Sequence, residues 1–281
     1  MIQTMLNGSV RSGQNSLRQD LRLLTLNISG PSVERAERLA AFMLPLDVDV
    51  AVLTETRANL GTERLLAEFE AAGYGIQAVL PSSKRERGVA VLNRTGSSSG
   101  IASPVQIDLS HRLAIEEIRE PGEFRLIAVY VPSRDATSEK IDRKRRFLDQ
   151  MMDVVQQEAM GGRVVLMGDL NVVGRTHLPR YPAFRAWEYD ALDHVMGHGL
   201  VDAFTKLHPG VQAHSWIGRT GNGYRYDYAF VSGALTKALR GCEYLHEPRL
   251  QGLSDHAALL LTLCGESLAA QAASDIRLAA A

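Results

Sequence analysis

The sequence predicts an α/β (α+β) protein that folds as a four-layer sandwich, with two mixed β-sheets packed face to face and helices on both outer faces. Two observations predict this fold class. Short apolar runs that are typical of buried strands alternate with helical segments along most of the chain. Some strands are joined by tight turns and others by long crossover helices, and this mixture excludes a purely doubly wound sheet.

The elements follow from these runs and from the residues that bound them. Helical runs predict helices at 32–44, 62–72 and 138–160. Apolar runs predict strands, in chain order, at 21–27, 48–55, 88–94, 113–119, 124–132, 164–171, 224–232 and 256–263. Ser32 is typical of an N-cap, Gly73 and Gly161-Gly162 end the second and third helices, and Pro121-Gly122-Glu123 forms a turn. Within 174–213 only an amphipathic stretch at 184–196 stands out.

One domain is expected at 21–265, preceded by a flexible leader at 1–20 and followed by an Ala-rich tail at 266–281. A chain of 281 residues with 45% hydrophobic content is long enough for one large two-sheet domain with a substantial core. No internal repeat or low-complexity linker divides it.

The charge and cysteine content narrow the class of protein. With 31 basic and 32 acidic residues, the chain has no global electrostatic attraction to nucleic acid, so a polyanion site must be a local basic patch. Two cysteines, Cys242 and Cys264, can form neither a disulfide framework nor a cysteine zinc site. The N-terminus lacks a signal-peptide core, and no run approaches the ~18 apolar residues of a membrane span. We therefore expect a cytoplasmic protein with no membrane association and no obligatory protein partner.

Polar residues that could bind a metal or move a proton stand next to four predicted strands. They are Asn27, Glu55, the pair Asp169 and Asn171, and the pair Asp255 and His256. Polar groups at strand ends escape the core and point into a crevice, where they can form a site. Taken singly, Glu55 could be a solvent-facing acid, Asn27 a turn cap and His256 a structural group. The combination favours a metal-assisted phosphoester hydrolase.

The segment GDLN is the most specific of these. On an extended chain Asp169 and Asn171 point to the same side, so one face offers an acid and an amide. The acid could orient or deprotonate water, while the amide stabilises charge on a phosphoryl oxygen. The alternative is a tight turn at Gly168, with Asn171 beginning a loop.

His256 needs a carboxylate that fixes its tautomer. Asp255 is adjacent and faces the opposite way on a strand, so it does not pair with His256. Asp227 is the better partner because it sits among apolar and aromatic residues, where an unpaired acid would be costly.

Seven short motifs occur in order along the chain: LNISG, LTET, GVAVLN, VYVPS, GDLN, GYRYDY and SDHA. Their order and spacing, over roughly 21–263, resemble the endonuclease/exonuclease/phosphatase family of magnesium-dependent phosphoesterases. The resemblance implies that Glu55 is the principal Mg²⁺ ligand, with Asn27 beside it and Asp255 as a second carboxylate near the metal. Mn²⁺ is expected to substitute for Mg²⁺.

The same resemblance implies five catalytic residues. Asp169 corresponds to the acid that activates the attacking water, and Asn171 to the amide that contacts the scissile phosphate. His256, oriented by Asp227, corresponds to the histidine that binds or polarises a phosphate oxygen. Tyr130 corresponds to a tyrosine that hydrogen-bonds the phosphate in the nuclease branch.

Two motifs resemble the exonuclease III-like branch in particular: Gly223-Tyr224-Arg225-Tyr226-Asp227 and Tyr130-Val131-Pro132. Substrate contacts are expected from Arg134, Tyr224 and Arg225, and from Arg87 in the basic loop 84–87. This loop either contacts a phosphate backbone or is a solvated surface loop. The basic cluster at 143–146 either contacts a phosphate backbone or forms a solvated helix face. The chain departs from this branch at Ser29 and Ser133, where many relatives carry an acid or an amide.

These observations favour a Mg²⁺-dependent DNA nuclease that acts as a 3′-5′ exonuclease or abasic-site endonuclease. The alternative is a soluble phosphoesterase of the same fold that acts on a nucleotide, inositol phosphate or lipid headgroup, and the balanced charge fits this alternative better. A scaffold without catalysis is disfavoured, because every expected metal and histidine position is filled.

Overall fold

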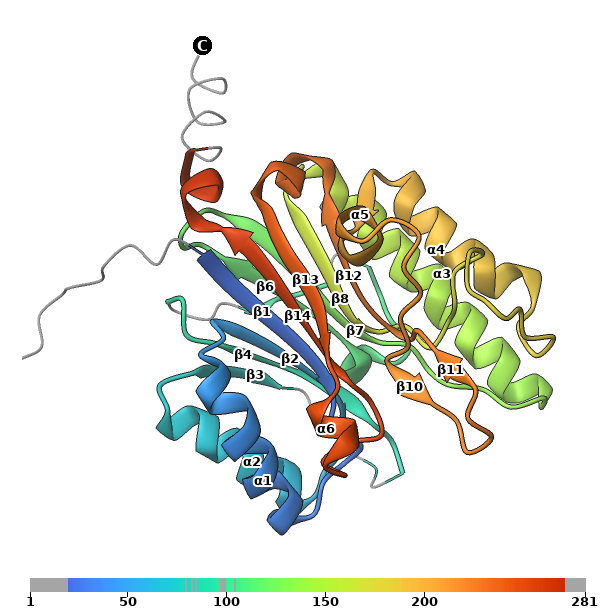
Figure 1. Ribbon diagram of the computed structural model, residues 1–281, viewed down its shortest axis with the longest axis horizontal. Coiled ribbons are helices and arrows are strands. Elements are labelled where there is room, and N and C mark those ends of the chain that lie inside the picture. The colour runs from blue at the N-terminus through green and yellow to red at the C-terminus, as the bar shows by residue number, and fades with distance from the viewer. Residues whose placement is uncertain are drawn as a thin grey trace, which may run out of the picture.

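The computed structural model describes residues 20–270 except positions 79, 82, 84, 97–99 and 104. Nearly all of the expected leader and the end of the expected tail lie outside the described residues. Two six-stranded mixed sheets pack face to face, with helices on both outer faces (Figure 1). The predicted fold class is therefore confirmed.

The first sheet has the order β13-β14-β1-β2-β4-β3. Its strands are β1 (Asp20–Asn27), β2 (Val50–Thr56), β3 (Gly75–Ala78), β4 (Gly88–Asn93), β13 (Leu239–Leu245) and β14 (Ala258–Cys264). Helices α1 (Val33–Met43) and α2 (Leu60–Ala71) cover its outer face, with a short 3₁₀ helix at Leu44–Leu46 (Figure 1).

The second sheet has the order β5-β6-β7-β8-β12-β9. Its strands are β5 (Gly100–Ile101), β6 (Leu113–Ile118), β7 (Phe124–Tyr130), β8 (Val164–Asp169), β9 (Leu200–Asp202) and β12 (Asp227–Ser232). Helices α3 (Ser138–Met160) and α4 (Ala186–Gly197) cover its outer face (Figure 1). Smaller elements complete the chain: α5 (Ala203–Leu207), α6 (Glu247–Leu250), 3₁₀ helices at Ser110–Arg112 and Gly233–Ala238, and the hairpin of β10 (Trp216–Ile217) and β11 (Gly223–Tyr224).

Strand periodicity divides the core into three clusters. In β1, Leu23 packs into the central cluster between the sheets, whereas its neighbour Leu24 packs under α1 and α2. In β8, Met167 faces the centre and Leu166 faces α3 and α4. Successive side chains of a strand point to opposite faces, so a strand covered on both faces reads as an unbroken apolar run. This is why the apolar runs located the central strands.

The strands that the sequence did not predict are β3, β5, β9, β13 and those of the β10–β11 hairpin. Most are short, and the longest, β13, is a partly exposed edge strand interrupted by a register shift between Leu239 and Gly241. Helix α2 begins at Leu60, earlier than expected, because the Asn59 side chain accepts a hydrogen bond from the Thr62 amide at 3.0 Å.

The carboxyl-terminal end of the described chain packs onto the domain. Residues 265–270 are helical, and Leu268 is fully buried in the central cluster. The Arg163 guanidinium donates to the Leu268 carbonyl at 3.0 Å. The packed part of the chain therefore continues beyond the expected boundary at 265.

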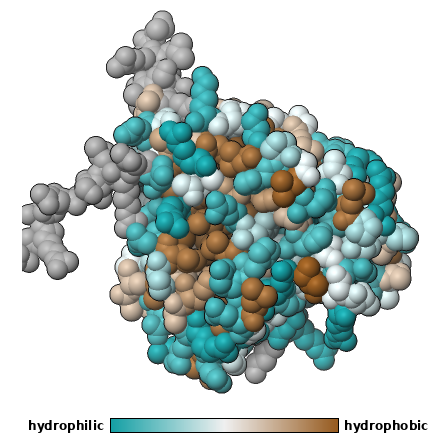
Figure 2. All heavy atoms as spheres, in the orientation of Figure 1, coloured by the Kyte–Doolittle hydropathy of each residue, from teal (hydrophilic) through white to brown (hydrophobic). Residues whose placement is uncertain are grey.

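On the face seen in Figure 2, separate apolar patches alternate with hydrophilic residues. No helix in the described part of the chain combines the length and the apolar character that a bilayer span requires.

Gly168 of β8 pairs with Val129 of β7, and its lack of a Cβ supplies a testable prediction. Its φ is +145°, and a Cβ there would lie 2.0 Å from the Val129 carbonyl oxygen. We expect Gly168→Ala to lower the free energy of unfolding by about 3 kcal/mol, measured by urea denaturation. Gly162→Ala, with φ +88° and no atom within 4 Å, is the matched control and should cost about 1 kcal/mol. Equal costs for the two variants would contradict a steric role for Gly168.

Candidate active site

The strand registers bring distant polar residues to one edge of the sandwich. Strand β1 runs parallel to β2, and Asn27 at its end lies opposite Thr54. In the other sheet Tyr130 pairs with Asp169 across the parallel strands β7 and β8, and Asp169 pairs with Asp227 across the antiparallel strands β8 and β12. Three of the expected site residues thus follow directly from the pairing of the second sheet.

Asp227 and His256 form the contact that the sequence predicts. The Asp227 Oδ2 atom lies 2.7 Å from His256 Nδ1, and both residues are buried. The His256 amide donates to Ser254 Oγ at 3.0 Å, and the His256 backbone forms an isolated antiparallel bridge with Trp216. These contacts fix the imidazole with its Nε2 edge toward Asn27.

Asn27 links the acid and the histidine. Its Nδ2 atom donates to Asp169 Oδ2 at 3.0 Å and lies 3.5 Å from His256 Nε2. Its Oδ1 atom accepts the Ser29 amide at 2.9 Å, which sets the orientation of the side-chain amide. Asn27 therefore touches both the acid expected to activate water and the histidine expected to bind a phosphate oxygen.

Asp169 is almost completely buried in this cluster. Burial, and then the charges of Asp227 and Glu55, raise the pKa of its carboxyl, while the charge of His256 and the hydrogen bond from Asn27 oppose the rise. A carboxyl with a raised pKa holds a proton more readily at neutral pH than an exposed aspartate does.

Asn171 does not lie on an extended strand as expected but begins the loop after β8, and its expected contact with the scissile phosphate stays a prediction. Strand β8 ends at Asp169, and Asn171 has a left-handed φ of +50°. Its Nδ2 atom donates to the Val131 carbonyl at 2.9 Å, while its backbone amide donates to Asp169 Oδ1 at 3.0 Å. Asn171 thus holds Asp169 through its main chain, because the chain turns before the strand alternation can apply.

Glu55 occupies an irregularity in β2. The pairing of β2 with β4 shifts between Thr54 and Thr56, and Glu55 itself has a left-handed φ of +57°. Its carboxylate accepts the Tyr130 hydroxyl at 3.0 Å and forms an ion pair with Arg87. Burial, followed by the charge of Glu55, raises the pKa of Tyr130, which therefore acts as a hydrogen-bond donor at neutral pH.

The cluster suits a hard cation. Asp169, Asp227 and His256 each offer a ligand atom, and these atoms lie within 4.8 Å of one another. Among the described residues, the buried Oδ1 atom of Asp227 has no hydrogen-bond partner. Glu55 and Asn27 add further oxygen atoms, and such oxygen-rich sets are what divalent cations such as Mg²⁺ prefer.

Asp255 does not join this cluster. It is exposed, and its Oδ2 atom accepts the indole N–H of Trp216 at 3.0 Å. The charge of Asp255 nevertheless raises the pKa of His256, and its role as a second carboxylate near the metal stays a prediction.

Arg225, from which a substrate contact is expected, has its guanidinium bound by groups of the protein. Its two Nη atoms bond the two oxygens of Asp202, each at 2.6 Å, and its Nε donates to the Tyr244 hydroxyl at 2.8 Å. The guanidinium also lies 4.4 Å from the Tyr228 ring centroid. Only 8% of the residue is exposed, so its donors are directed into the protein.

The other expected substrate residues have mixed surroundings. Arg134 pairs with the buried Glu188 of α4, and Arg87 pairs with Glu55. Tyr224 is half-buried and stacks on Tyr181, with ring centroids 4.3 Å apart.

The basic cluster at 143–146 is expected either to contact a phosphate backbone or to form a solvated helix face. As a whole it fits neither expectation. Lys144 is buried, and its Nζ donates to Glu188 Oε1 and to the Asn171 carbonyl, both at 2.7 Å. Arg143 donates to Glu86 at 2.6 Å, whereas Arg146 is exposed. Glu188 and the tyrosines of 174–213 were not assigned to the site from the sequence. The aromatic-rich stretch at 181–189 could have indicated them.

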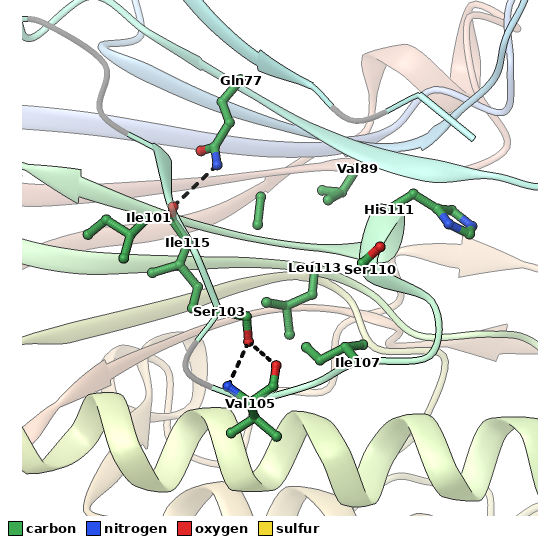
Figure 3. A pocket seen from close by; sticks show the side chains of 11 residues that line it. Gln77, Val89, Ile101, Ser103, Val105, Ile107, Ser110, His111, Leu113 and Ile115 are labelled. Atoms are coloured by element: carbon green, nitrogen blue, oxygen red, sulfur yellow. Dashed lines mark hydrogen bonds between the residues drawn. The ribbon is translucent and has the colours of Figure 1, made fainter. Parts of the chain in front are cut away.

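A cavity of about 200 Å³ lies apart from this cluster, between the edges of the two sheets (Figure 3). Most of its lining is apolar, and Gln77 crosses it to donate to the Ile115 carbonyl at 3.4 Å. The Ser103 hydroxyl in its wall is already bonded to the Val105 backbone. This cavity offers none of the chemistry of the Asp169 cluster.

A family model described as endonuclease/exonuclease/phosphatase matches residues 24–256. The chain belongs to the endonuclease/exonuclease/phosphatase family. Members of this family are metal-dependent hydrolases of phosphoester bonds, so the chain is a metal-dependent phosphoesterase.

Similar proteins support membership of the endonuclease/exonuclease/phosphatase family. An exodeoxyribonuclease of Bacillus subtilis (strain 168) is 24% identical over 242 residues, which cover 78% of this chain and 91% of the relative. A Neisseria meningitidis 3′-5′ exonuclease has a TM-score of 0.74 at 22% identity and covers 87% of this chain and all of its own. An AP endonuclease from Archaeoglobus fulgidus has a TM-score of 0.72 at 22% identity, and the match covers 86% of this chain and 99% of the endonuclease chain. These structures share the fold of this chain.

The buried Asp227–His256 pair gives a second prediction. Burial alone would lower the pKa of His256, but the charge of Asp227 and its hydrogen bond outweigh burial and raise that pKa from 6.5 to about 10. The pair therefore stabilises the fold fully below pH 6.5, and this contribution is lost as the pH rises toward 10. We expect Asp227→Asn to lower the His256 pKa below 6.5, as measured by imidazole ¹⁵N chemical shifts.

The same variant should lose about 3 kcal/mol of unfolding free energy at pH 6, because a buried charge loses its partner. Asp255→Asn is the control, since Asp255 is exposed and contributes less to the His256 pKa. A variant imidazole that stays protonated above pH 9 would show that Asp227 does not set its pKa.

Proposed function

We propose that this protein is a Mg²⁺-dependent nuclease that hydrolyses phosphodiester bonds of DNA, as a 3′-5′ exonuclease or an abasic-site endonuclease. The observation that carries the proposal is the buried cluster in which Asn27 contacts both Asp169 and His256 while Asp227 pairs with the imidazole. The B. subtilis relative is named an exodeoxyribonuclease, and a Neisseria neighbour of similar fold is a 3′ phosphatase bound to a DNA hairpin (TM-score 0.73, 21% identity, covering 86% of this chain and 98% of its own).

Proton transfer in this proposal belongs to Asp169. Its raised pKa brings the carboxyl closer to the working pH, which suits a group that takes a proton from the attacking water. The hydrogen bonds from Asn27 and from the Asn171 amide hold its two oxygens in place. A fixed carboxylate can keep the water in line with the phosphorus atom.

His256 stabilises charge on the phosphoryl group. With Asp227 on Nδ1, the imidazolium can present Nε2–H to a non-bridging oxygen as a charge-assisted donor. Glu55, Asn27 and the buried aspartates offer the oxygen ligands for Mg²⁺ or Mn²⁺. When bound, the cation would neutralise charge on the leaving oxygen.

A group of aromatic side chains beside this cluster favours nucleic acid as the substrate. We call it the aromatic shelf, and it consists of Tyr181, Phe184, Trp216, Tyr224 and Tyr226. Tyr224 stacks on Tyr181 at 4.3 Å and on Tyr226 at 5.3 Å, and all five residues are partly exposed. Unpaired bases stack on such rings, whereas a small phosphoester without a base gains little from them.

A small phosphoester remains the second candidate, because several cations are already neutralised. The guanidinium groups of Arg134, Arg143 and Arg225 are all engaged with carboxylates of the protein. The net charge of −1 also gives the chain no overall attraction to a DNA backbone. Cleavage of DNA that is nearly insensitive to salt between 50 and 200 mM would favour this candidate.

A substrate panel tests the catalytic assignment. Wild-type protein with Mg²⁺ should cut a duplex with an abasic site or a recessed 3′ end, and a chelator should abolish the cleavage. Glu55→Gln and Asp169→Asn should each lower the rate at least about 10²-fold, since each removes a group that acts in the transition state. Asp108→Asn is an exposed control that should keep full activity. Near-wild-type rates for both site variants would contradict the assignment.

Tyr224→Ala tests the aromatic shelf. Loss of a stacking surface should raise KM for a DNA substrate about 10-fold, which corresponds to one base–aromatic contact. The rate on a small phosphodiester such as bis(p-nitrophenyl) phosphate should not change, and this substrate serves as the internal control. A similar loss on both substrates would mean that Tyr224 supports the site rather than a base.

A further inference from the structure

We propose that Arg87 is a built-in counter-cation of Glu55, which a divalent metal ion must displace before the site can act. The released guanidinium is then free to bind the substrate phosphate. The proposal rests on the proposed role of Glu55 as a metal ligand, and it does not depend on DNA being the substrate.

The contacts of Glu55 carry the proposal. Its Oε2 atom pairs with Arg87 Nη1, and its Oε1 atom accepts the Tyr130 hydroxyl at 3.0 Å. Both carboxylate oxygens are therefore engaged with protein donors. The side chains of Arg87 and Glu55 are 29% and 16% exposed, so the pair is partly shielded yet still reachable from solvent.

The pairing of the adjacent strands β2 and β4 brings the side chains of Glu55 and Arg87 together. Strand β4 begins at Gly88, directly after Arg87, and Gly88 pairs with Thr56. The register shift in β2 falls between Thr54 and Thr56, so Glu55 is the extra residue at that point. A bulge re-aims the side chain of its extra residue, and here that side chain meets Arg87.

The residue before Arg87 is anchored separately. Glu86 accepts hydrogen bonds from Arg143 at 2.6 Å and from Arg112 at 3.3 Å. Arg112 also lies 4.5 Å from the ring centroid of Tyr130. These contacts fix the start of β4, so Arg87 reaches Glu55 from an ordered backbone.

The chemistry of the two groups implies competition. A guanidinium stays protonated at every working pH, so it cannot leave Glu55 by losing its charge. A metal ion that takes the Glu55 oxygens must push Arg87 away, because the two cations repel and share one ligand. A displaced arginine beside the site is a suitable bidentate donor for a phosphate. By linkage, the phosphate that captures Arg87 then favours binding of the metal ion.

Metal affinity of the free protein tests the proposal directly. Binding of Mn²⁺ to the full-length protein is measured from the EPR signal of the unbound ion, with no substrate present. Arg87→Gln should bind Mn²⁺ at least about 3-fold more tightly than wild type, the change that corresponds to losing one partly exposed ion pair. Arg85→Gln removes the same charge two residues away at an exposed position and should bind as wild type does. Unchanged or weaker binding by Arg87→Gln would overturn the proposal.

Three further measurements complete the test. Arg87→Lys keeps the positive charge but lacks the paired N–H donors of a guanidinium, so it should bind Mn²⁺ with intermediate affinity. This variant also serves as a control for a folding defect in Arg87→Gln. In a Glu55→Gln background, Arg87→Gln should give no gain. Dimethyl phosphate should tighten Mn²⁺ binding by wild type and have less effect on Arg87→Gln, and an equal effect on both would overturn the phosphate half of the proposal.

The outcomes separate this proposal from the proposed function. Glu55→Gln protein that binds Mn²⁺ as wild type does would remove Glu55 from the metal site, and Arg87 would lose its role with it. If Arg87→Gln binds Mn²⁺ more tightly but the wild-type protein does not cleave DNA, the counter-cation proposal is supported and only the proposed substrate is contradicted.

Discussion

The site depends on two hydrogen bonds that cross from one sheet to the other. Asn27 ends β1 in the first sheet and donates to Asp169 at the end of β8 in the second. Asp227, at the start of β12 in the second sheet, pairs with His256, which lies just before β14 in the first. All four residues are buried, so an unmatched partner would be costly. The two sheets therefore have to pack in one alignment for the polar cluster to be satisfied.

Much of the two-sheet arrangement could be predicted from sequence, because an unbroken apolar run indicates a buried strand. Asp227 could be identified as the partner of His256, since an acid within a strand of apolar and aromatic residues needs a counter-group. What could not be predicted is which side chains meet where the chain leaves its strands. Asn171 leaves the strand with a left-handed φ and so lies in a loop, and Arg225 points inward because Asp202, on the neighbouring strand β9, satisfies its guanidinium. Both outcomes depend on contacts between residues distant in sequence.

The segment 174–213, which gave the weakest signal in sequence, contributes to the site from outside. Glu188 of α4 is buried and binds both Lys144 of α3 and Arg134. Burial lowers the pKa of Lys144, and the charge of Glu188 opposes this effect and favours the ammonium form. The same Lys144 holds the Asn171 carbonyl, so the buried ion pair is joined to the loop that carries the Asp169 contact. The segment thus supplies Glu188 to the ion pair behind the Asn171 loop, and Tyr181 and Phe184 to the aromatic shelf.

The backbone bridge between Trp216 and His256 bears on how a bound nucleotide would be positioned relative to the imidazole. Trp216 belongs to the aromatic shelf, and its indole is also tied to Asp255, the residue before the imidazole. One backbone contact and one side-chain contact therefore tie Trp216 to the segment that carries the imidazole. In the proposed nuclease, a base stacked on Trp216 would lie close to His256, so these two contacts would decide which phosphate of the bound strand reaches the imidazole.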